Sequence, residues 1–456
     1  MALKERLLIG CAAGFSGDRV DAAGPVVREL IARGQSAVLI FETLAERTLA
    51  LAQLARRDDP DAGFEPLLDE LLRPVLADCL AHGVRIVSNF GAANPHGAAR
   101  RIQQLARGLG LRAPRIAVVH GDDLSGPEHH DLLARCLGAA MPAEPPVSAN
   151  AYIGAEAIAN ALRAGADIVV AGRVADPALA LGPALAHHGW ALDDWDRLAG
   201  ATMAGHLLEC GAQVTGGYFA DPGYKDVPGL AELGYPIAEI EADGSCTLFK
   251  PRGTGGRLDL HTVKEQLLYE LHDPGAYLTP DVVADIREAE VLQTAGGVRL
   301  QGVRGHVRPA TLKVNVCHAT GWFAEGEISY AGARALGRAR LAGEVLRERL
   351  RDAGALRVDL IGACSIFGDD AGRALAATLD AAPAAPDNAL RDIRLRVALQ
   401  HPDAAVARRL VREVTALYCC GPAGGGGVRT GMWPRLGTLS CLVPREAVST
   451  GYFMAD

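Results

Sequence analysis

A histidine and a glutamate three residues apart are the first candidates for chemistry. His206 and Glu209 occur in the segment GHLLEC, and in a helix they would share one face. A carboxylate that orients an imidazole raises its basicity, which suits general acid–base catalysis. A buried pair that only satisfies its own hydrogen bonds is the structural alternative. Because no H-E-x-x-H motif or second matched pair occurs, we expect no metal ion.

Polar side chains also follow five short apolar runs in the first half of the chain. Such residues are Ser16, Asp18, Arg19, Glu42, Asn89, Asn94, Arg173 and Asp176. We expect Asp18 and Glu42 to be alternative acid–base groups, and the three asparagines Asn89, Asn94 and Asn150 to orient a substrate. Arg173 would pair with a substrate carboxylate through two N–H groups. Short loops are polar wherever they face water, so a merely solvated edge remains the alternative.

Two glycine-dense loops carry flanking cations. The first contains Lys250, Thr254 and Gly255, and the second contains Gly424, Gly425, Gly426 and Arg429. Successive peptide N–H groups without side chains can form an anion-binding nest, so we expect phosphate or carboxylate binding at these loops. A tightly packed or flexible loop is the alternative.

The elements that must position these residues alternate between strand and helix. Runs rich in β-branched residues occur at 7–10, 36–41, 84–90, 115–120 and 167–171, with helical patterns between them. This order predicts an α/β fold with a doubly wound, mostly parallel, Rossmann-like sheet. Ligands of such sheets bind beyond the carboxyl ends of the strands, so the polar loops would share one crevice. Glycines at 10, 14 and 17 do not match G-x-G-x-x-G, and no P-loop occurs, so a nucleotide-dependent enzyme is only a third hypothesis.

The second half has a different character. Strand-like pieces there lack a regular helix between each pair, which predicts an α+β domain. We therefore expect two domains, at 1–220 and 221–456, with a boundary in the glycine- and proline-containing stretch 215–230.

Composition limits the class of protein. The chain has 456 residues, with 46 basic and 54 acidic side chains and a net charge of −8. That charge argues against nucleic acid as the main partner. No apolar run is long enough to span a membrane, and the ten cysteines form no C-x-x-C pair. We expect a soluble protein of the reducing cytoplasm.

Nine segments, in order along nearly the whole chain, carry a family resemblance. They are IGCAAGFSGDRVDAA, FETLAERTLALAQ, SNFGAANPHGAA, SANAYIGAEAIANAL, GADIVVAGRVADPAL, GHLLECGAQVTGGYF, KPRGTGG, EQLLYELHDPGAYLTPDV and GPAGGGG. Together they resemble the acyclic terpene utilisation family (AtuA-type proteins).

The resemblance implies a role in the breakdown of terpenes such as citronellol and geraniol, a route that passes through acyl-CoA thioesters. It supplies no catalytic residues, so the sites named above come from the residues themselves. We expect an enzyme of lyase or hydratase type that acts on a small branched carboxylic acid or its acyl-CoA thioester. Coenzyme A would enter as part of the substrate.

The partners that we expect are a small-molecule substrate and further copies of this chain. Some proteins similar to this one continue into a small C-terminal domain, so a separate small subunit is a further expectation. The alternative from another class is a non-catalytic subunit that binds acyl-CoA or stabilises a partner enzyme.

Overall fold

The computed structural model describes residues 6–380 and 392–455. The chain forms two compact units, one of Met1–Cys317 with Thr438–Asp456 and the other of His318–Gly437. The boundary expected near residue 220 falls inside the first unit, because strands from both sides of that position pair in one sheet.

Five parallel strands form the centre of the first unit, in the order β1-β2-β3-β6-β4. They are β1 (Arg6–Cys11), β2 (Ser36–Phe41), β3 (Arg85–Ser88), β6 (Ile168–Val170) and β4 (Ile116–His120). Nearly all their residues are buried, as expected for strands that helices cover on both faces. The five apolar runs of the sequence are thus confirmed as strands.

Antiparallel strands extend this centre on both sides into a mixed sheet of ten strands. Beyond β1 come β7 (Ile237–Glu241), β8 (Cys246–Phe249), β12 (Gly297–Gln301) and β11 (Glu290–Thr294), and beside β4 lies β18 (Gly451–Met454). The α/β class is confirmed. The antiparallel half was not expected from the sequence, because those strands are short and follow irregular segments.

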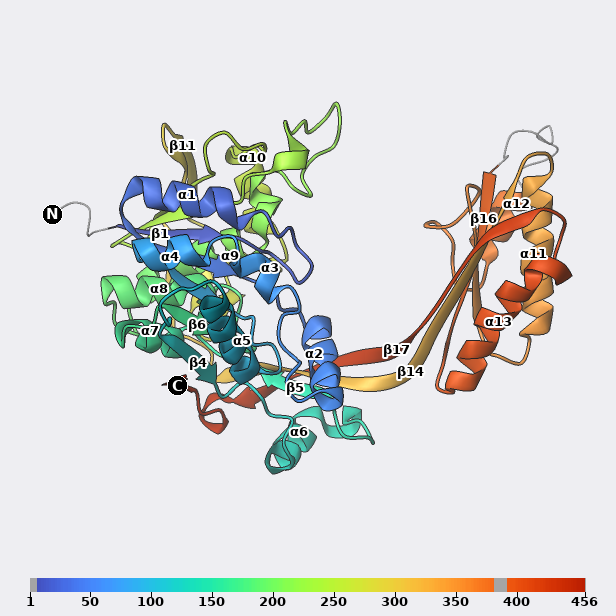
Figure 1. Ribbon diagram of the computed structural model, residues 1–456, viewed down its shortest axis with the longest axis horizontal. Helices are drawn as coiled ribbons and strands as arrows, with labels where there is room; N and C mark the ends of the chain where they lie inside the picture. The colour runs from blue at the N-terminus through green and yellow to red at the C-terminus, as the bar shows by residue number, and fades with distance from the viewer. Residues whose placement is uncertain (1–5, 381–391, 456) are drawn as a thin grey trace. The chain divides into compact units, whose positions relative to one another are not determined.

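Helices cover the two faces of the sheet (Figure 1). On one face lie α1 (Ala23–Arg33), α3 (Leu68–Leu72), α4 (Leu76–His82) and α5 (Pro95–Gly108); on the other lie α7 (Glu156–Arg163), α8 (Ala178–His188) and α9 (Trp195–Glu209). Alternation along β1 explains both cores, since Leu8 faces the first set and Leu7 and Ile9 face the second.

Helix α9 is buried over most of its length. A small sheet in the order β13 (Arg304–His306), β10 (Val283–Asp285) and β9 (Tyr277–Leu278) packs against it. The C-terminal end of α9 therefore lies in the interior of the first unit.

No helix among the described residues is long and apolar enough to cross a membrane.

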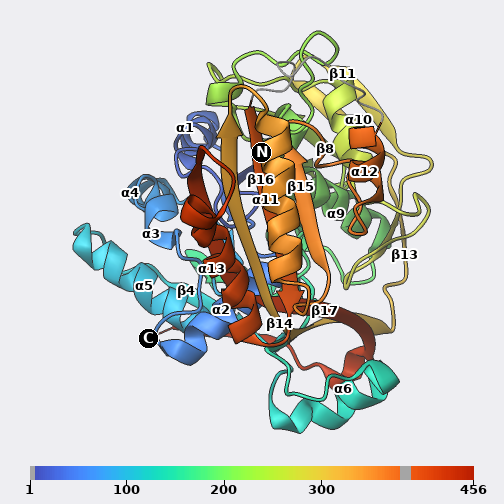
Figure 2. The same ribbon diagram turned by 90° about the vertical axis from the view of Figure 1, so that its right-hand side faces the viewer.

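The second unit is a sheet with helices on one face. Its strand order is β15 (Leu356–Ile361), β16 (Asp392–His401), β14 (Thr311–Ala331) and β17 (Gly425–Pro444), and the last two strands each have one end in the first unit. Figure 2 shows α11 (Ala335–Arg349) and α13 (Ala404–Cys420) across the strands. Ile328 and Tyr330 of β14 belong to the apolar core that includes these helices, whereas Glu325 alternates to the other face and binds Arg396 of β16.

Candidate functional site

A cavity of about 1030 Å³ lies beyond the carboxyl ends of the parallel strands of the first unit. We call it the reaction cavity. Its walls come from the loops after β1, β2 and β6, the C-terminal end of α9, and the segments 269–280, 309–313 and 440–442. The structure thus brings together three of the five polar loops singled out in the sequence. The loops after β3 and β4 support it from behind.

Glu209 is on the wall of this cavity and His206 is behind it. The two residues lie one turn apart on α9, with His206 Nδ1 3.1 Å from Glu209 Oε1. His206 Nε2 is 3.0 Å from the carbonyl oxygen of Gln266, and the imidazole is 1% exposed. Among the described residues, Glu209 Oε2 has no hydrogen-bond partner although it is buried.

The surroundings fix where protons can reside in this pair. A carbonyl oxygen can only accept, so Nε2 of His206 must carry a proton and donate it to Gln266. One further proton then lies between Nδ1 and Oε1, either on the imidazole or on the carboxyl group. Burial raises the pKa of Glu209 to about 7, although the hydrogen bond with His206 works against this rise. The pKa of Glu209 is thus shifted towards neutral pH, as a group that gives and takes a proton requires.

A second buried cluster lies on the same wall and contains Glu42, Arg173 and Asp176. Burial raises the pKa of Glu42 well above its usual range, as does the negative charge of Asp176, while Arg173 opposes both effects. Burial likewise raises the pKa of Asp176 against the charge of Arg173. Arg173 donates to Asp176, and its guanidinium lies 4.6 Å from the ring centroid of Tyr152.

Arg173 has little left to offer a substrate carboxylate. Of the five N–H groups of a guanidinium, the Nε–H and one Nη2–H donate to the carbonyl oxygen of Val174, the other Nη2–H to Asp176, and one Nη1–H to the carbonyl oxygen of Leu44. One N–H of Nη1 remains. This arrangement does not offer the paired donors that bidentate binding requires.

The loop after β1 is organised by Asp18. Its carboxylate accepts hydrogen bonds from the backbone N–H groups of Gly14 and Arg19, at 2.8 and 2.7 Å, and from the Tyr235 hydroxyl at 2.5 Å. Asp18 lies on the cavity wall, but these bonds give it a positioning role. Ser16 lies near Glu65, and its hydroxyl lowers the pKa of that carboxyl group against the larger effect of burial. Arg19 pairs with Asp21 outside the cavity.

The three asparagines are supports and do not line the cavity. Asn89 donates to Glu42 at 2.7 Å and accepts from the backbone N–H of Thr43. Asn94 caps α5 through the N–H of Gly97. Asn150 donates to Asp122, which also accepts from the backbone N–H of Arg173. Asn89 thus holds a residue of the cavity wall directly, and Asn150 supports Arg173 through Asp122.

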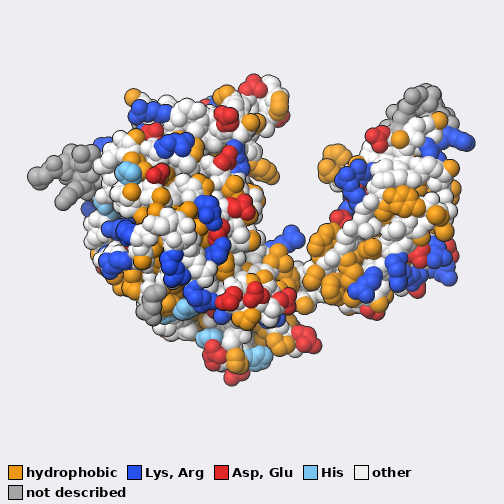
Figure 3. Space-filling view, in the orientation of Figure 1, with side chains coloured by type: hydrophobic (Ala, Val, Ile, Leu, Met, Phe, Trp, Pro, Cys, Tyr) orange, Lys and Arg blue, Asp and Glu red, His pale blue; other side chains and the backbone are white. Residues whose placement is uncertain are grey.

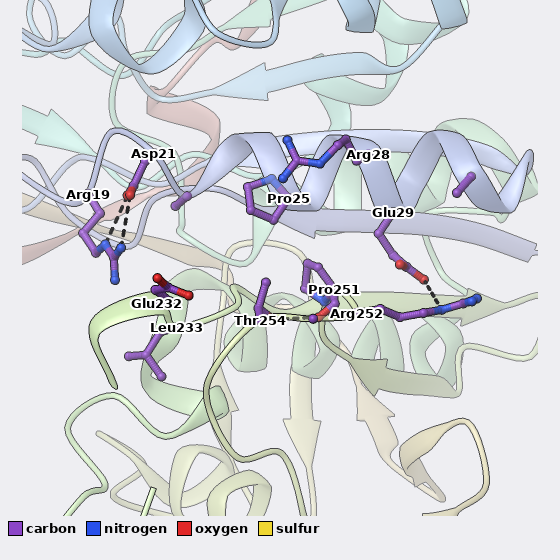
Figure 4. A pocket seen from close by; sticks show the side chains of 13 residues that line it. Arg19, Asp21, Pro25, Arg28, Glu29, Glu232, Leu233, Pro251, Arg252 and Thr254 are labelled. Carbon is purple, nitrogen blue, oxygen red and sulfur yellow. Dashed lines mark hydrogen bonds and ion pairs between the residues drawn. The ribbon is translucent and has the colours of Figure 1, made fainter. Parts of the chain in front are cut away.

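The first glycine loop lies beside another pocket, of about 710 Å³, which α1 borders (Figure 4). Lys250 Nζ donates to the carbonyl oxygen of Thr254, whose hydroxyl donates to Pro251. The N–H of Gly255 donates to the carbonyl oxygen of Glu232. These donors, which we expected to be free for an anion, are therefore used within the protein.

The second glycine segment belongs to the second unit, where Gly424 precedes β17 and Gly425, Gly426 and Arg429 lie within that strand. A Cβ at Gly425 would lie 2.8 Å from Ile328 and 3.1 Å from Tyr330, so close packing explains this glycine. Gly424 adopts a φ of +73°, which glycine accommodates without strain. Gly426 has open space around it, and Arg429 is exposed.

Several residues of the reaction cavity had no expected role. Tyr277 packs on His206 with ring centroids 5.2 Å apart, and its hydroxyl has no hydrogen-bond partner among the described residues. Burial, followed by the charge of Glu209, raises its pKa, so the phenol stays protonated. Tyr218 and Glu270, also on the wall, are two of the four described non-glycine residues with positive φ.

The tyrosines would have been difficult to find from the sequence. Five of the nine in the chain line the cavity, and they are Tyr152, Tyr218, Tyr235, Tyr269 and Tyr277. They come from segments far apart in the chain, and the stretch from 269 to 281 has the pattern of a helix end followed by a turn. Only the fold brings them together.

The described residues contain no cluster of three or more His, Cys, Asp or Glu side chains that could hold a metal ion.

A family model matches the chain over residues 7–454, and its description is "Acyclic terpene utilisation family protein AtuA". No curated protein and no solved structure matches the chain.

Proposed function

The chain belongs to the acyclic terpene utilisation (AtuA) family, and we propose that it is an enzyme acting on a branched acyl thioester in acyclic terpene breakdown. The chemistry is that of a lyase or hydratase, which moves a proton at the carbon beside the thioester carbonyl. The observation that carries this proposal is the buried, unpartnered Oε2 of Glu209, a residue of the cavity wall that His206 supports from behind.

Glu209 is the proton acceptor in this proposal. Its Oε2 takes the proton from the carbon, and the electron pair of the C–H bond moves onto the carbonyl oxygen to form an enolate. Tyr277, a protonated phenol on the same wall, donates a hydrogen bond to that oxygen. The enolate then expels a β-hydroxyl group, which takes the proton from Glu209 and leaves as water, so the reaction needs no oxidant or reductant.

The charges of the cavity favour a thioester over a free acid. Six carboxyl side chains line it: Asp18, Glu42, Glu46, Asp176, Glu209 and Glu270. The cations on its wall are Arg173 and Lys313, and both already face acids: Arg173 donates to Asp176, and Lys313 Nζ lies 3.4 Å from Glu46. A substrate carboxylate would meet more acidic groups than cations, and both cations are already engaged, whereas a neutral acyl thioester needs no cation.

The test is turnover of a panel of branched acyl-CoA thioesters, with products identified by mass spectrometry. Glu209→Gln keeps the size of the side chain but cannot accept the proton, so we expect at least about a 100-fold loss of rate. The matched control is Glu446→Gln, an exposed carboxyl outside the cavity, which should retain the wild-type rate. Wild-type protein that binds these thioesters without converting any of them would instead identify a binding subunit.

A further inference from the structure

A second, basic pocket of about 600 Å³ adjoins the reaction cavity. We call it the rim pocket, and its walls are formed by Phe219, Tyr224, Lys225, Arg257, His261, Lys264, Glu265, Leu268 and Tyr269. Tyr269 lines both the rim pocket and the reaction cavity, and Tyr218 on the cavity wall directly precedes Phe219. The two pockets therefore share a wall residue and are neighbours in the first unit.

Resting on the proposed function, we propose that the rim pocket binds the phosphorylated nucleotide end of an acyl-CoA thioester, whose acyl group occupies the reaction cavity. Phosphates need cations or N–H donors, and an adenine ring needs an aromatic or apolar surface. The rim pocket has both, and the reaction cavity, with its excess of carboxyl groups, has no place for phosphates.

The charge of the rim pocket supports an anionic ligand. Three cations line it, Lys225, Arg257 and Lys264, against one carboxylate, Glu265. Lys225 Nζ is 2.5 Å from Glu265, and Arg257 Nε is 2.5 Å from Asp259. Lys264 on α10 (Leu260–Leu268) is exposed and has no partner among the described residues, so it is the cation left for a ligand. On the face seen in Figure 3, basic and acidic side chains are interspersed over the first unit, so a locally basic lining is distinctive in a chain of net charge −8.

The aromatic residues of the rim pocket support a base-bearing ligand. The Phe219 ring is buried beneath two cations, with Lys225 Nζ at 4.6 Å and Arg257 Cζ at 5.6 Å from its centroid. Tyr224 is 81% exposed on the wall and offers a free surface for stacking. Aromatic rings together with Lys264, the cation of this pocket without a partner among the described residues, are a combination that suits nucleotides.

The pocket of Figure 4 gives an internal comparison. It has three arginines, Arg19, Arg28 and Arg252, but also three acids on its wall. Figure 4 shows two of the arginines facing acids, Arg19 with Asp21 and Arg252 with Glu29. With its charges balanced and no aromatic residue on its wall, that pocket lacks the features of the rim pocket.

The experiment is calorimetric titration of the whole protein with coenzyme A, adenosine 3′,5′-bisphosphate and adenosine. We expect the first two to bind, with an affinity that falls as salt is added, and adenosine to bind much more weakly. Lys264→Glu should weaken both phosphorylated ligands at least 10-fold. Arg28→Glu, the same charge change at an exposed arginine of the Figure 4 pocket, should leave both affinities unchanged.

Each other outcome is informative. Equal effects of the two variants, no effect of Lys264→Glu, or adenosine binding as tightly as coenzyme A would overturn the assignment of the rim pocket. If acyl-CoA thioesters are converted while Lys264→Glu leaves KM unchanged, the assignment fails but the proposed function stands. If the bisphosphate binds through Lys264 and no thioester is converted, the assignment stands and the proposed chemistry fails.

Discussion

His206 Nδ1 lies 3.1 Å from Glu209 Oε1, and of these two residues only Glu209 reaches the reaction cavity. The glutamate is therefore the group that can touch a substrate, while the histidine positions it and shares its proton. Both side chains are nearly enclosed, and the carbonyl oxygen of Gln266 accepts a hydrogen bond from Nε2 of the imidazole. This arrangement leaves Glu209 Oε2 as the exchangeable position.

Tyr277→Phe should lower kcat/KM about 100-fold, because one donor to a developing oxyanion is removed. The ring and its packing on His206 remain, so the melting temperature should stay close to that of the wild type. Tyr330→Phe in the second unit is the control. Its buried hydroxyl has no partner among the described residues, so its loss should change neither property. A full rate in Tyr277→Phe would remove this residue from the mechanism.

Gly14→Ala should destabilise the first unit by about 1–3 kcal/mol. A Cβ at this position would lie 2.5 Å from the backbone carbon of Cys210 and 2.6 Å from the nitrogen of Gly211, which cannot move aside easily. The change would separate the loop after β1 from the end of α9. Gly108→Ala, where the Cβ has open space, should be neutral or slightly stabilising. Urea denaturation of both variants tests this, and equal midpoints would contradict it.

Asp122→Asn should change how stability depends on pH. Burial raises the pKa of Asp122 to about 6, from the usual 3.8 of an aspartate. The folded protein therefore binds more protons than the unfolded chain between these values, so wild-type stability falls as pH rises from about 4 to 6. The variant lacks this loss, which is on the order of 2 kcal/mol. We would measure the unfolding free energies of the wild type and of Asp122→Asn across pH 4–7, and we expect the difference between them to change with pH. A constant difference would show that Asp122 does not titrate in this way.

Arg396→Ala should lower the free energy of unfolding of the second unit by about 2 kcal/mol. This is more than the loss of an exposed ion pair costs and less than the loss of a buried one. Arg396 donates to Glu325 at 2.6 and 2.9 Å and to the buried Asp359 at 3.0 Å. We expect faster hydrogen exchange in β15 and β16. Arg351→Ala breaks an exposed pair with Glu348 and should stay within about 0.5 kcal/mol of the wild type. Unchanged exchange in Arg396→Ala would contradict the account.

The sequence was most informative where local patterns coincide with burial. Short apolar runs predicted the parallel strands, because a strand covered on both faces has no polar side to interrupt its pattern. The paired antiparallel strands and β18 carry no such signal, since their partners come from distant parts of the chain. For the same reason the domain boundary was placed at a change of composition, although the sheet continues across it through β7.

Part of the candidate site could be predicted from the sequence, because its residues follow strands that the sequence also predicts. Asp18, Glu42, Arg173 and Asp176 follow buried strands, so the fold class alone indicates their common edge. Which of them faces the cavity depends on side-chain hydrogen bonds that no local pattern encodes: Asn89 and Asn150 turn inward to support Glu42 and Asp122. Neither the residue type nor the spacing of Tyr277 and Lys264 in the sequence indicated a functional role.

The most direct test of the central claim is the pH dependence of deuterium exchange at the α-carbon of a bound branched acyl-CoA, followed by NMR in heavy water. If Glu209 is the base, the rate should rise with pH to a plateau, with a midpoint near the pKa of about 7 that burial gives this carboxyl group. His206→Leu removes the hydrogen bond that holds that pKa down, so its midpoint should move to higher pH. Glu209→Gln should abolish the exchange. A Glu209→Gln variant that exchanges at the wild-type rate with the same profile would show that another group moves the proton.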